Sequence, residues 1–183
     1  MTTAIMDPTG RTEKQASAGL ALASRPADLS GVSVGLLENG KQNARLFLEE
    51  VAGVLRVRHR VGDVQLRRKE VFSAPAPPEL VDELSAASDV VVIGVGDCGS
   101  CSASAIADGV LFERHGTPAA VICSDAFTAT ADAMAEVQEA PGYHYITTPH
   151  PVAGLTPGQV RDRAEQVAAE VAEVLAAQGR QVA

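Results

Sequence analysis

The sequence is poor in aromatic residues and contains no tryptophan. Only 3% of its 183 residues are aromatic, so the core must be built from aliphatic side chains. Basic residues are also scarce: 15 Lys and Arg stand against 23 Asp and Glu, for a net charge of −8 and a pI near 4.9. This balance argues against a nucleic-acid partner and against binding to an acidic membrane surface. No apolar run approaches the ~20 residues of a membrane helix, and the polar start lacks the features of a signal peptide. We therefore expect a cytoplasmic protein without a membrane partner.

Cysteine is rare as well, since the chain has only three. Two of them, Cys98 and Cys101, form a Cys-x-x-Cys motif. In a reducing cytoplasm such a pair is more often catalytic, redox-active or metal-binding than a structural disulfide. A zinc site would need two further soft ligands. The sequence offers only Cys123 and four unpaired histidines for this. We expect no metal and no cofactor.

Short apolar runs alternate with longer amphipathic segments along most of the chain. Strands that are apolar on both faces and are joined by helices predict a parallel sheet covered on both sides. The expected fold is α/β, a three-layer sandwich with a five-stranded, mostly parallel, flavodoxin-like sheet. Residues 1–30 are expected to form an N-terminal arm with a short edge strand at 4–6, and residues 31–183 a single domain. The expected strands are 32–37, 64–66, 90–95, 119–123 and 143–147, and the expected helices 44–55, 78–87, 103–115, 127–139 and 157–178.

The central apolar run 90–95 leads directly into a loop that we interpret as a thiol active site, at residues 96–102. This strand-to-helix turn is where an α/β sheet places its ligand crevice. A helix N-terminus favours the reactive thiolate, and a second cysteine three residues on can resolve an adduct formed on the first. The backbone N–H groups from Gly99 through Ser100 to Ser102 are expected to hold an anionic group. The alternative is a pair of buried structural thiols.

Two further side chains are catalytic candidates. Asp97 is either a general acid or base or a turn former, and its charge would raise the pKa of the neighbouring thiol. His150 lies between two prolines after the fifth expected strand, which suits a positioned acid or base, although a turn histidine is the alternative. Cys123 ends the fourth strand and reads as a small core residue.

The remaining candidates follow other strands and would open onto the same edge of the sheet. Each also has an ordinary structural interpretation. Asn39, Lys41 and Asn43 would bind a carboxylate or phosphate, or form a polar turn with Asn43 as a helix N-cap. Lys69, in the basic run 67–69, would attract an anionic substrate or lie on a solvated face. Ser124 would contact substrate or cap the next helix.

The chain resembles the UGSC family of selenoproteins and their cysteine forms, whose defining motif is Sec-Gly-Ser-Cys after a hydrophobic strand. Here the motif reads Gly96-Asp97-Cys98-Gly99-Ser100-Cys101-Ser102. Four other stretches are also similar to the family: residues 7–10, residues 37–43, Lys69, and Pro149-His150-Pro151. The selenocysteine position falls on Cys98, which implies that Cys98 is the nucleophile and Cys101 its resolving partner. A looser likeness, over residues 93–105, is to one half of the aspartate/glutamate racemase fold.

These observations predict three kinds of function. The first is a cysteine-dependent enzyme that performs thiol-redox or C–S and C–X bond chemistry on a small anionic substrate, with a low-molecular-weight thiol as a candidate partner. The second is a cofactor-free racemase, isomerase or lyase with Cys98 as proton-transfer base, for which a homodimer would bring two loops together. The third is a non-enzymatic sulfur carrier or metal-binding accessory protein.

Overall fold

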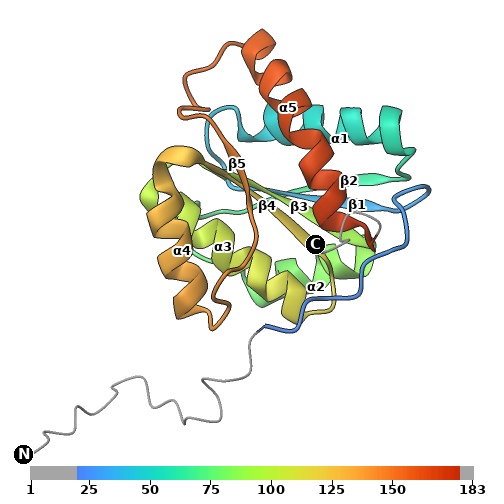
Figure 1. The fold of residues 1–183 in the computed structure, drawn as a ribbon, viewed down its shortest axis with the longest axis horizontal. Coiled ribbons are helices and arrows are strands. Elements are labelled where there is room, and N and C mark those ends of the chain that lie inside the picture. Colours follow the sequence, from blue (N-terminus) through green and yellow to red (C-terminus); the bar gives the residue numbers. More distant parts are fainter. Residues whose placement is uncertain (1–19, 178–183) are drawn as a thin grey trace, which may run out of the picture.

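The computed structural model describes residues 20–177, and in this range helices and strands alternate along the chain (Figure 1). Their bounds agree with the expected elements to within a few residues. The strands are β1 Val34–Glu38, β2 Val64–Arg68, β3 Val90–Gly96, β4 Ala119–Ser124 and β5 Ile146–Thr148. The helices are α1 Ala44–His59, α2 Pro78–Ala87, α3 Gly99–Arg114, α4 Thr128–Val137 and α5 Pro157–Leu175, with a short 3-10 turn, η1, at Asp125–Phe127.

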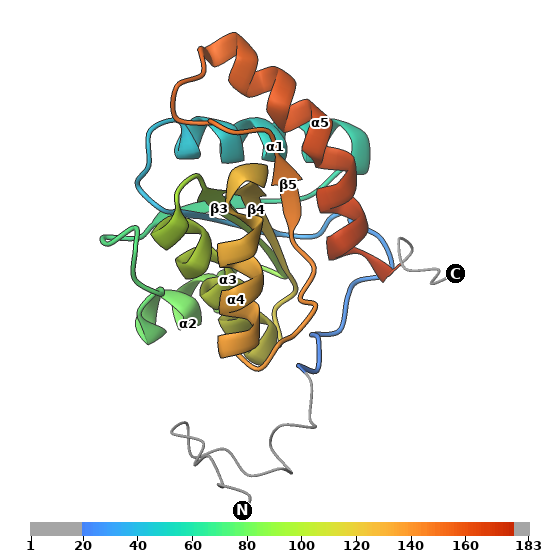
Figure 2. The ribbon, with the colours of Figure 1, turned by 60° about the vertical axis from the view of Figure 1, so that its left-hand side comes forward.

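The strands form one sheet in the order β2-β1-β3-β4-β5, and every neighbouring pair is parallel. This is the strand order of flavodoxin-like folds. Helices α1 and α5 cover one face, and α2, α3 and α4 cover the other (Figure 2). The predicted three-layer α/β sandwich is therefore confirmed. β3 occupies the middle of the sheet, and all seven of its residues are buried.

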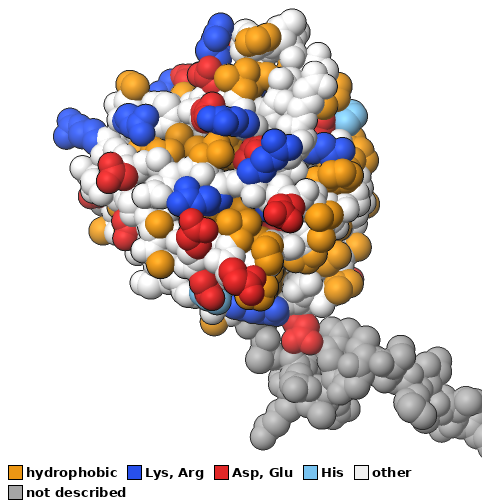
Figure 3. Space-filling model, turned by 180° about the vertical axis from the view of Figure 1, so that it is seen from behind, with side chains coloured by type: hydrophobic (Ala, Val, Ile, Leu, Met, Phe, Trp, Pro, Cys, Tyr) orange, Lys and Arg blue, Asp and Glu red, His pale blue; other side chains and the backbone are white. Residues whose placement is uncertain are grey.

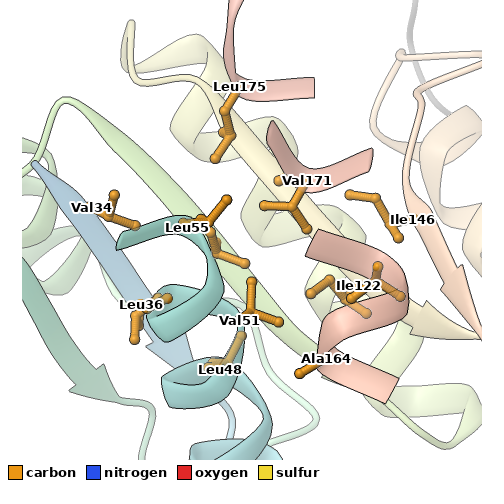
Figure 4. Packing of buried hydrophobic residues seen from close by; sticks show 14 of the residues in the cluster. Val34, Leu36, Leu48, Val51, Leu55, Ile122, Ile146, Ala164, Val171 and Leu175 are labelled. Carbon is orange, nitrogen blue, oxygen red and sulfur yellow. The ribbon is translucent and has the colours of Figure 1, made fainter. Parts of the chain in front are cut away.

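The core is aliphatic, as the lack of aromatic residues requires. On the face covered by α1 and α5, Leu48, Val51 and Leu55 of α1 pack with Ile122 of β4 and Val171 of α5 (Figure 4). A second cluster, on the other face of the sheet, includes Ile93 of β3 and Phe112 of α3. Burying a side chain of this size stabilises the fold by about 1.5–3 kcal/mol. The two clusters hold the carboxyl ends of the strands in a fixed arrangement.

The helix starts differ from the sequence-based expectation at two places. α3 begins at Gly99 rather than at residue 103, because the Cys98 side chain accepts the Cys101 N–H and so caps the helix before its Ser-rich first turn. α4 is preceded by η1, which occupies the start of the expected helix 127–139. α5 begins with a capping box formed by Thr156 and Gln159. α5 ends at Leu175, three residues before the expected end at residue 178, because the backbone of Ala176 is extended.

The described part of the expected N-terminal arm, residues 20–30, lies against the domain. Arg25 makes a bidentate ion pair with Glu113 of α3, with distances of 2.7 and 2.6 Å, and Leu29 is 2% exposed. Near the end of the chain, Ala177 N–H donates to Pro26 O. The expected strand at 4–6 lies outside the described residues. Figure 3 shows acidic and basic side chains interspersed on the face seen from behind. In residues 20–177 no helix has the length and apolar character needed to cross a membrane.

Candidate active site

The two cysteines of the motif lie where β3 passes into α3, at the carboxyl edge of the sheet. Cys98 is the N-cap residue of α3 and is partly exposed, whereas Cys101 in the first turn is completely buried. Their sulfurs form a disulfide across a Cα–Cα distance of 5.1 Å. The Cys98 Sγ also accepts the Cys101 N–H at 3.2 Å and lies 3.6 Å from Ser100 Oγ. The pair therefore combines one accessible and one inaccessible cysteine.

Some backbone N–H groups of the loop form hydrogen bonds within the turn, and others are candidates for binding a ligand. Cys101 N–H points to the Cys98 sulfur, and Ser102 N–H donates to Cys98 O at 2.9 Å. Ser102 was expected to contribute to an anion site, but its N–H is used within the turn and its side chain is buried. The amides of Gly99 and Ser100 stay as the candidate anion donors, because these are the first two residues of α3 and the first N–H groups of a helix have no carbonyl partner within it. Gly99 has open space around its Cα, with Thr130 Oγ1 3.9 Å from an ideal Cβ.

Cys123 lies beneath the loop. It is buried at the end of β4, opposite Gly96 in the β3–β4 pairing. A Cβ added at Gly96 would lie 2.7 Å from Cys123 Sγ and 2.8 Å from Ser102 Oγ, so only glycine fits there. Burial raises the pKa of the Cys123 thiol to about 12, while the Ser102 hydroxyl and the Gly96 backbone oppose the rise. Cys123 is therefore an inert core thiol in the folded protein.

The Asp97 carboxylate is directed at the loop that follows β5. Its Oδ1 lies 3.0 Å from His150 Nδ1, and its Oδ2 accepts the N–H groups of Val152 and Ala153 at 3.0 and 2.9 Å. Its side chain is only 5% exposed. Asp97 thus joins the loop after β3 to residues that lie more than 50 positions later in the chain. The expectation of a simple turn former is wrong for this side chain.

His150 is held on several sides. Besides Asp97, Ser124 Oγ lies 3.3 Å from its Nδ1, and its backbone N–H donates to Asp125 Oδ1 at 3.0 Å. The Phe127 ring packs edge-on against the imidazole, with centroids 5.3 Å apart. One interpretation of Ser124 was a helix cap, but its side chain makes no capping hydrogen bond to the following turn. Its hydroxyl donates instead to Gly96 O at 3.1 Å. The carboxyl ends of β3, β4 and β5 therefore meet around one histidine.

The loop after β1 contributes structure next to this site. Asn39 is 3% exposed, donates to Val95 O at 2.8 Å and accepts Lys41 N–H at 3.3 Å. Asn43 begins α1 without a side-chain cap, contrary to expectation, because its amide donates to the carbonyls of Val152, Ala153 and Leu155. Both asparagines fasten loops to one another, and neither amide is turned to an open crevice.

Of the two candidate lysines, Lys41 lies nearer the surface. Its Nζ lies 4.2 Å from the centroid of the Phe72 ring, which comes from the loop after β2. Lys69 is 2% exposed and binds Asp108 Oδ2 at 2.5 Å and Ser104 Oγ at 2.6 Å. This placement corrects the expectation that Lys69 faces an anionic substrate. The loop after β2 folds the lysine back onto α3, where it is fully paired.

Three residues near the candidate residues were not assigned a role from the sequence: Phe72, Asp108 and Phe127. Asp108 carried a signal, since it is a carboxylate within the otherwise apolar stripe of helix 103–115 and therefore needed a buried partner. The two phenylalanines carried none. Among residues 20–177, no three His, Cys, Asp or Glu side chains gather in a way that could hold a metal ion.

Comparisons with known proteins place the chain in a family. No curated protein matches it. Among solved structures, the chain is similar to the flavodoxin-like domain of a Synechococcus sp. protein at 10% identity, covering 77% of this chain and 96% of that one with a TM-score of 0.41, a likeness too weak to carry an argument. The UGSC family model matches residues 4–177, nearly the whole sequence. The chain belongs to the UGSC family.

Proposed function

We propose that the protein is a cysteine-dependent enzyme of thiol–disulfide chemistry, with Cys98 as the attacking thiol and Cys101 as the resolving one. The observation that carries this proposal is the unequal exposure of two sulfurs at disulfide distance: Cys98 is partly exposed at the cap of α3, and Cys101 is buried. An external sulfur can reach only the first. The second can react only with an adduct that already sits on its neighbour.

The reaction runs in two steps that balance. In the first, the Cys98 thiolate attacks a substrate disulfide R–S–S–R′, so that a Cys98–S–S–R bond forms and R′S⁻ leaves. In the second, the Cys101 thiolate attacks the Cys98 sulfur, which forms the Cys98–Cys101 disulfide and releases RS⁻. The substrate gains the two electrons that the dithiol loses. Two equivalents of a low-molecular-weight thiol then reduce the protein by the reverse exchange and are themselves oxidised to a disulfide.

The local backbone favours this chemistry. The Cys101 N–H already points at Cys98 Sγ, and the N-terminal end of α3 carries a partial positive charge that stabilises a thiolate. The amides of Gly99 and Ser100, together with Lys41, would hold an anionic group of the substrate. We place the reaction in the cytoplasm, where such a disulfide is transient and catalytic rather than structural.

The two other functions make different demands. A racemase-like enzyme needs Cys98 as a free thiolate base throughout its cycle, and it would introduce solvent deuterium into recovered substrate. A sulfur carrier or metal-binding protein would be purified with a stoichiometric persulfide or metal. The disulfide between the two motif cysteines favours the redox proposal over both.

The test is a trapping experiment on reduced protein with glutathione disulfide as the probe. Cys101→Ser should accumulate a mixed disulfide on Cys98, visible as one added glutathione in the intact mass, whereas the wild-type chain should pass to the internal disulfide without retaining the adduct. Cys98→Ser should form no adduct, and Cys123→Ser, which changes the third cysteine, should behave as wild type. A Cys98→Ser protein that gains a glutathione adduct as fast as Cys101→Ser does would overturn the proposal.

A further inference from the structure

We infer that His150 is the proton-transfer group of the Cys98 site, acting through Nε2, and that Asp97 is the residue that positions it. This inference rests on the proposed function and names the group that moves the proton in it. The observation behind it is that two side chains, Asp97 after β3 and Ser124 at the end of β4, converge on one ring nitrogen, Nδ1, of a histidine that follows β5. A histidine that merely filled a turn would not need this arrangement.

The hydrogen bonds decide which nitrogen carries the proton. Asp97 Oδ1, 3.0 Å from Nδ1, can only accept. Ser124 Oγ, 3.3 Å from the same nitrogen, uses its hydroxyl proton on Gly96 O and so also accepts there. Nδ1 is therefore the protonated nitrogen of the neutral ring. The lone pair is on Nε2, on a side chain that is 37% exposed.

The ring is fixed as well as polarised. Phe127 packs edge-on against it, and Asp125 holds the backbone of residue 150. The ionisable groups that face the histidine are Asp97 from the end of β3 and Asp125 from η1, both acidic. Since Asp97 also binds two backbone N–H groups of the following loop, its carboxylate cannot swing away without breaking them. Nε2 is thus presented at the carboxyl edge of the sheet, where Cys98 also lies.

In the exchange step, one proton must move from the Cys98 thiol to the leaving sulfur, and Nε2 carries it. Nε2 takes the proton of the Cys98 thiol, and the resulting thiolate attacks the substrate disulfide. The imidazolium then gives the same proton to the departing sulfur, so that R′SH leaves in place of R′S⁻. No proton is gained or lost overall, and His150 returns to its starting state.

Leaving-group dependence tests this assignment. An alkyl disulfide such as hydroxyethyl disulfide releases a basic thiolate that benefits from a proton, whereas dithiobis(nitrobenzoate) releases a thiolate that needs none. His150→Gln should slow single-turnover oxidation of the reduced protein by hydroxyethyl disulfide by about 100-fold, the usual size of an acid–base contribution. With dithiobis(nitrobenzoate), the rate per Cys98 thiolate should change by about threefold or less, because that leaving group departs unaided. Iodoacetamide alkylates the Cys98 thiolate with loss of iodide, which needs no proton, so the alkylation rate reports the amount of thiolate. Each disulfide-exchange rate is divided by this alkylation rate.

The matched control is His115→Gln. His115 also pairs with an aspartate, since its Nε2 lies 2.7 Å from Asp82 Oδ1, but it sits at the far end of α3. This variant should react with both disulfides at the wild-type rate. Equal slowing of both reactions in His150→Gln, or no slowing in either, would overturn the inference and leave the proposed function standing. A wild-type protein that neither disulfide oxidises would overturn the proposed function itself.

Asp97→Asn tests the positioning role by a signal that loss of packing does not produce. The amide oxygen must accept the N–H groups of Val152 and Ala153, so its NH₂ group faces His150 Nδ1 and turns that nitrogen into an acceptor. The ring proton should then move to Nε2, which ¹⁵N NMR of the imidazole detects directly. Selective slowing with hydroxyethyl disulfide should accompany the change. An unchanged tautomer with wild-type rates would contradict the role given to Asp97.

Discussion

Replacing Lys69 tests whether this residue binds an anionic substrate, as the sequence suggested, or stabilises the fold through its buried ion pair with Asp108. Its Nζ is bound to Asp108 and Ser104, and the two charged side chains are 2% and 1% exposed. Lys69→Met keeps the length of the side chain but leaves the Asp108 carboxylate with only the Ala76 N–H, at 2.6 Å. Breaking one side of a buried ion pair costs about 3–5 kcal/mol, a large part of the ~5–15 kcal/mol that stabilises a whole domain.

The pH dependence of this loss follows from Asp108. Burial raises the pKa of its carboxyl above the ordinary value of 3.8, and Lys69 opposes the rise. In Lys69→Met the opposing charge is gone, so the pKa rises further. The folded state then holds this proton more tightly than the unfolded chain. Stability therefore falls as pH rises from about 4 through the raised folded value, and the variant should lose more at pH 8 than at pH 5.

Urea unfolding at the two pH values measures the effect, and Lys69→Met/Asp108→Leu is the matched control. The double variant has no charge at these two positions and deprives the Ala76 N–H of its acceptor, whereas the Ser104 hydroxyl still donates to Ala74 O at 2.7 Å. It should therefore be more stable than Lys69→Met at pH 8. Below its melting temperature, Lys69→Met should retain the disulfide-exchange rate of the wild type. A variant that is within 1 kcal/mol of wild-type stability but has lost exchange would refute this reasoning and return Lys69 to substrate binding.

Two further outcomes test the surroundings of the site. Because burial raises the pKa of Cys123 to about 12, iodoacetamide at pH 8.5 should leave this thiol unmodified in the reduced, folded protein and label it only after unfolding. Peptide masses measure the labelling, and modification of Cys123 in the folded protein would contradict its burial. Glu113→Gln removes the charge that holds Arg25 and should cost about 2 kcal/mol, less than a fully enclosed pair because the arm can move to water. The Ala23 N–H donates to Glu113 Oε2 at 2.7 Å in the wild type, so hydrogen exchange of the Ala23 amide should be faster in the variant. An unchanged exchange rate would show that the arm is held by other contacts.

The fold was largely predictable because its signals are local. β1, β3 and β4 lie in short apolar runs, and the starts of α2 and α5 carry the clearest signals, Pro78 and the Thr156 capping box. The start of α3 was missed because Gly-Ser-Cys-Ser is a poor helix sequence, and the deciding contact is a cysteine side chain acting as a cap. β5 is shorter than expected, since Tyr143 instead closes a turn with Ala140.

The candidate site was predictable in composition but less so in arrangement. The strand-end rule correctly brought Cys98, Ser124 and His150 to one edge of the sheet. What it could not supply is the direction of each side chain, which depends on loops that are distant in sequence. Asn43 shows this clearly: the residue begins a helix as expected, yet its amide holds a loop about 110 positions later. Lysine strongly prefers the protein surface, so no sequence pattern could have predicted the burial of Lys69.

Asp97 presented a conflict in the sequence, because a carboxylate next to Cys98 should disfavour the thiolate that the proposed chemistry needs. The arrangement of the site removes this conflict. The carboxylate is 5% exposed and its hydrogen bonds go to the 150–153 loop, one of them to the imidazole of His150. When His150 has taken the proton from Cys98, the Asp97–His150 pair is neutral overall, so the negative charge next to the thiolate is compensated at the moment the thiolate forms. The two residues therefore act on Cys98 as a unit, and removing His150 alone should expose the full unfavourable effect of Asp97.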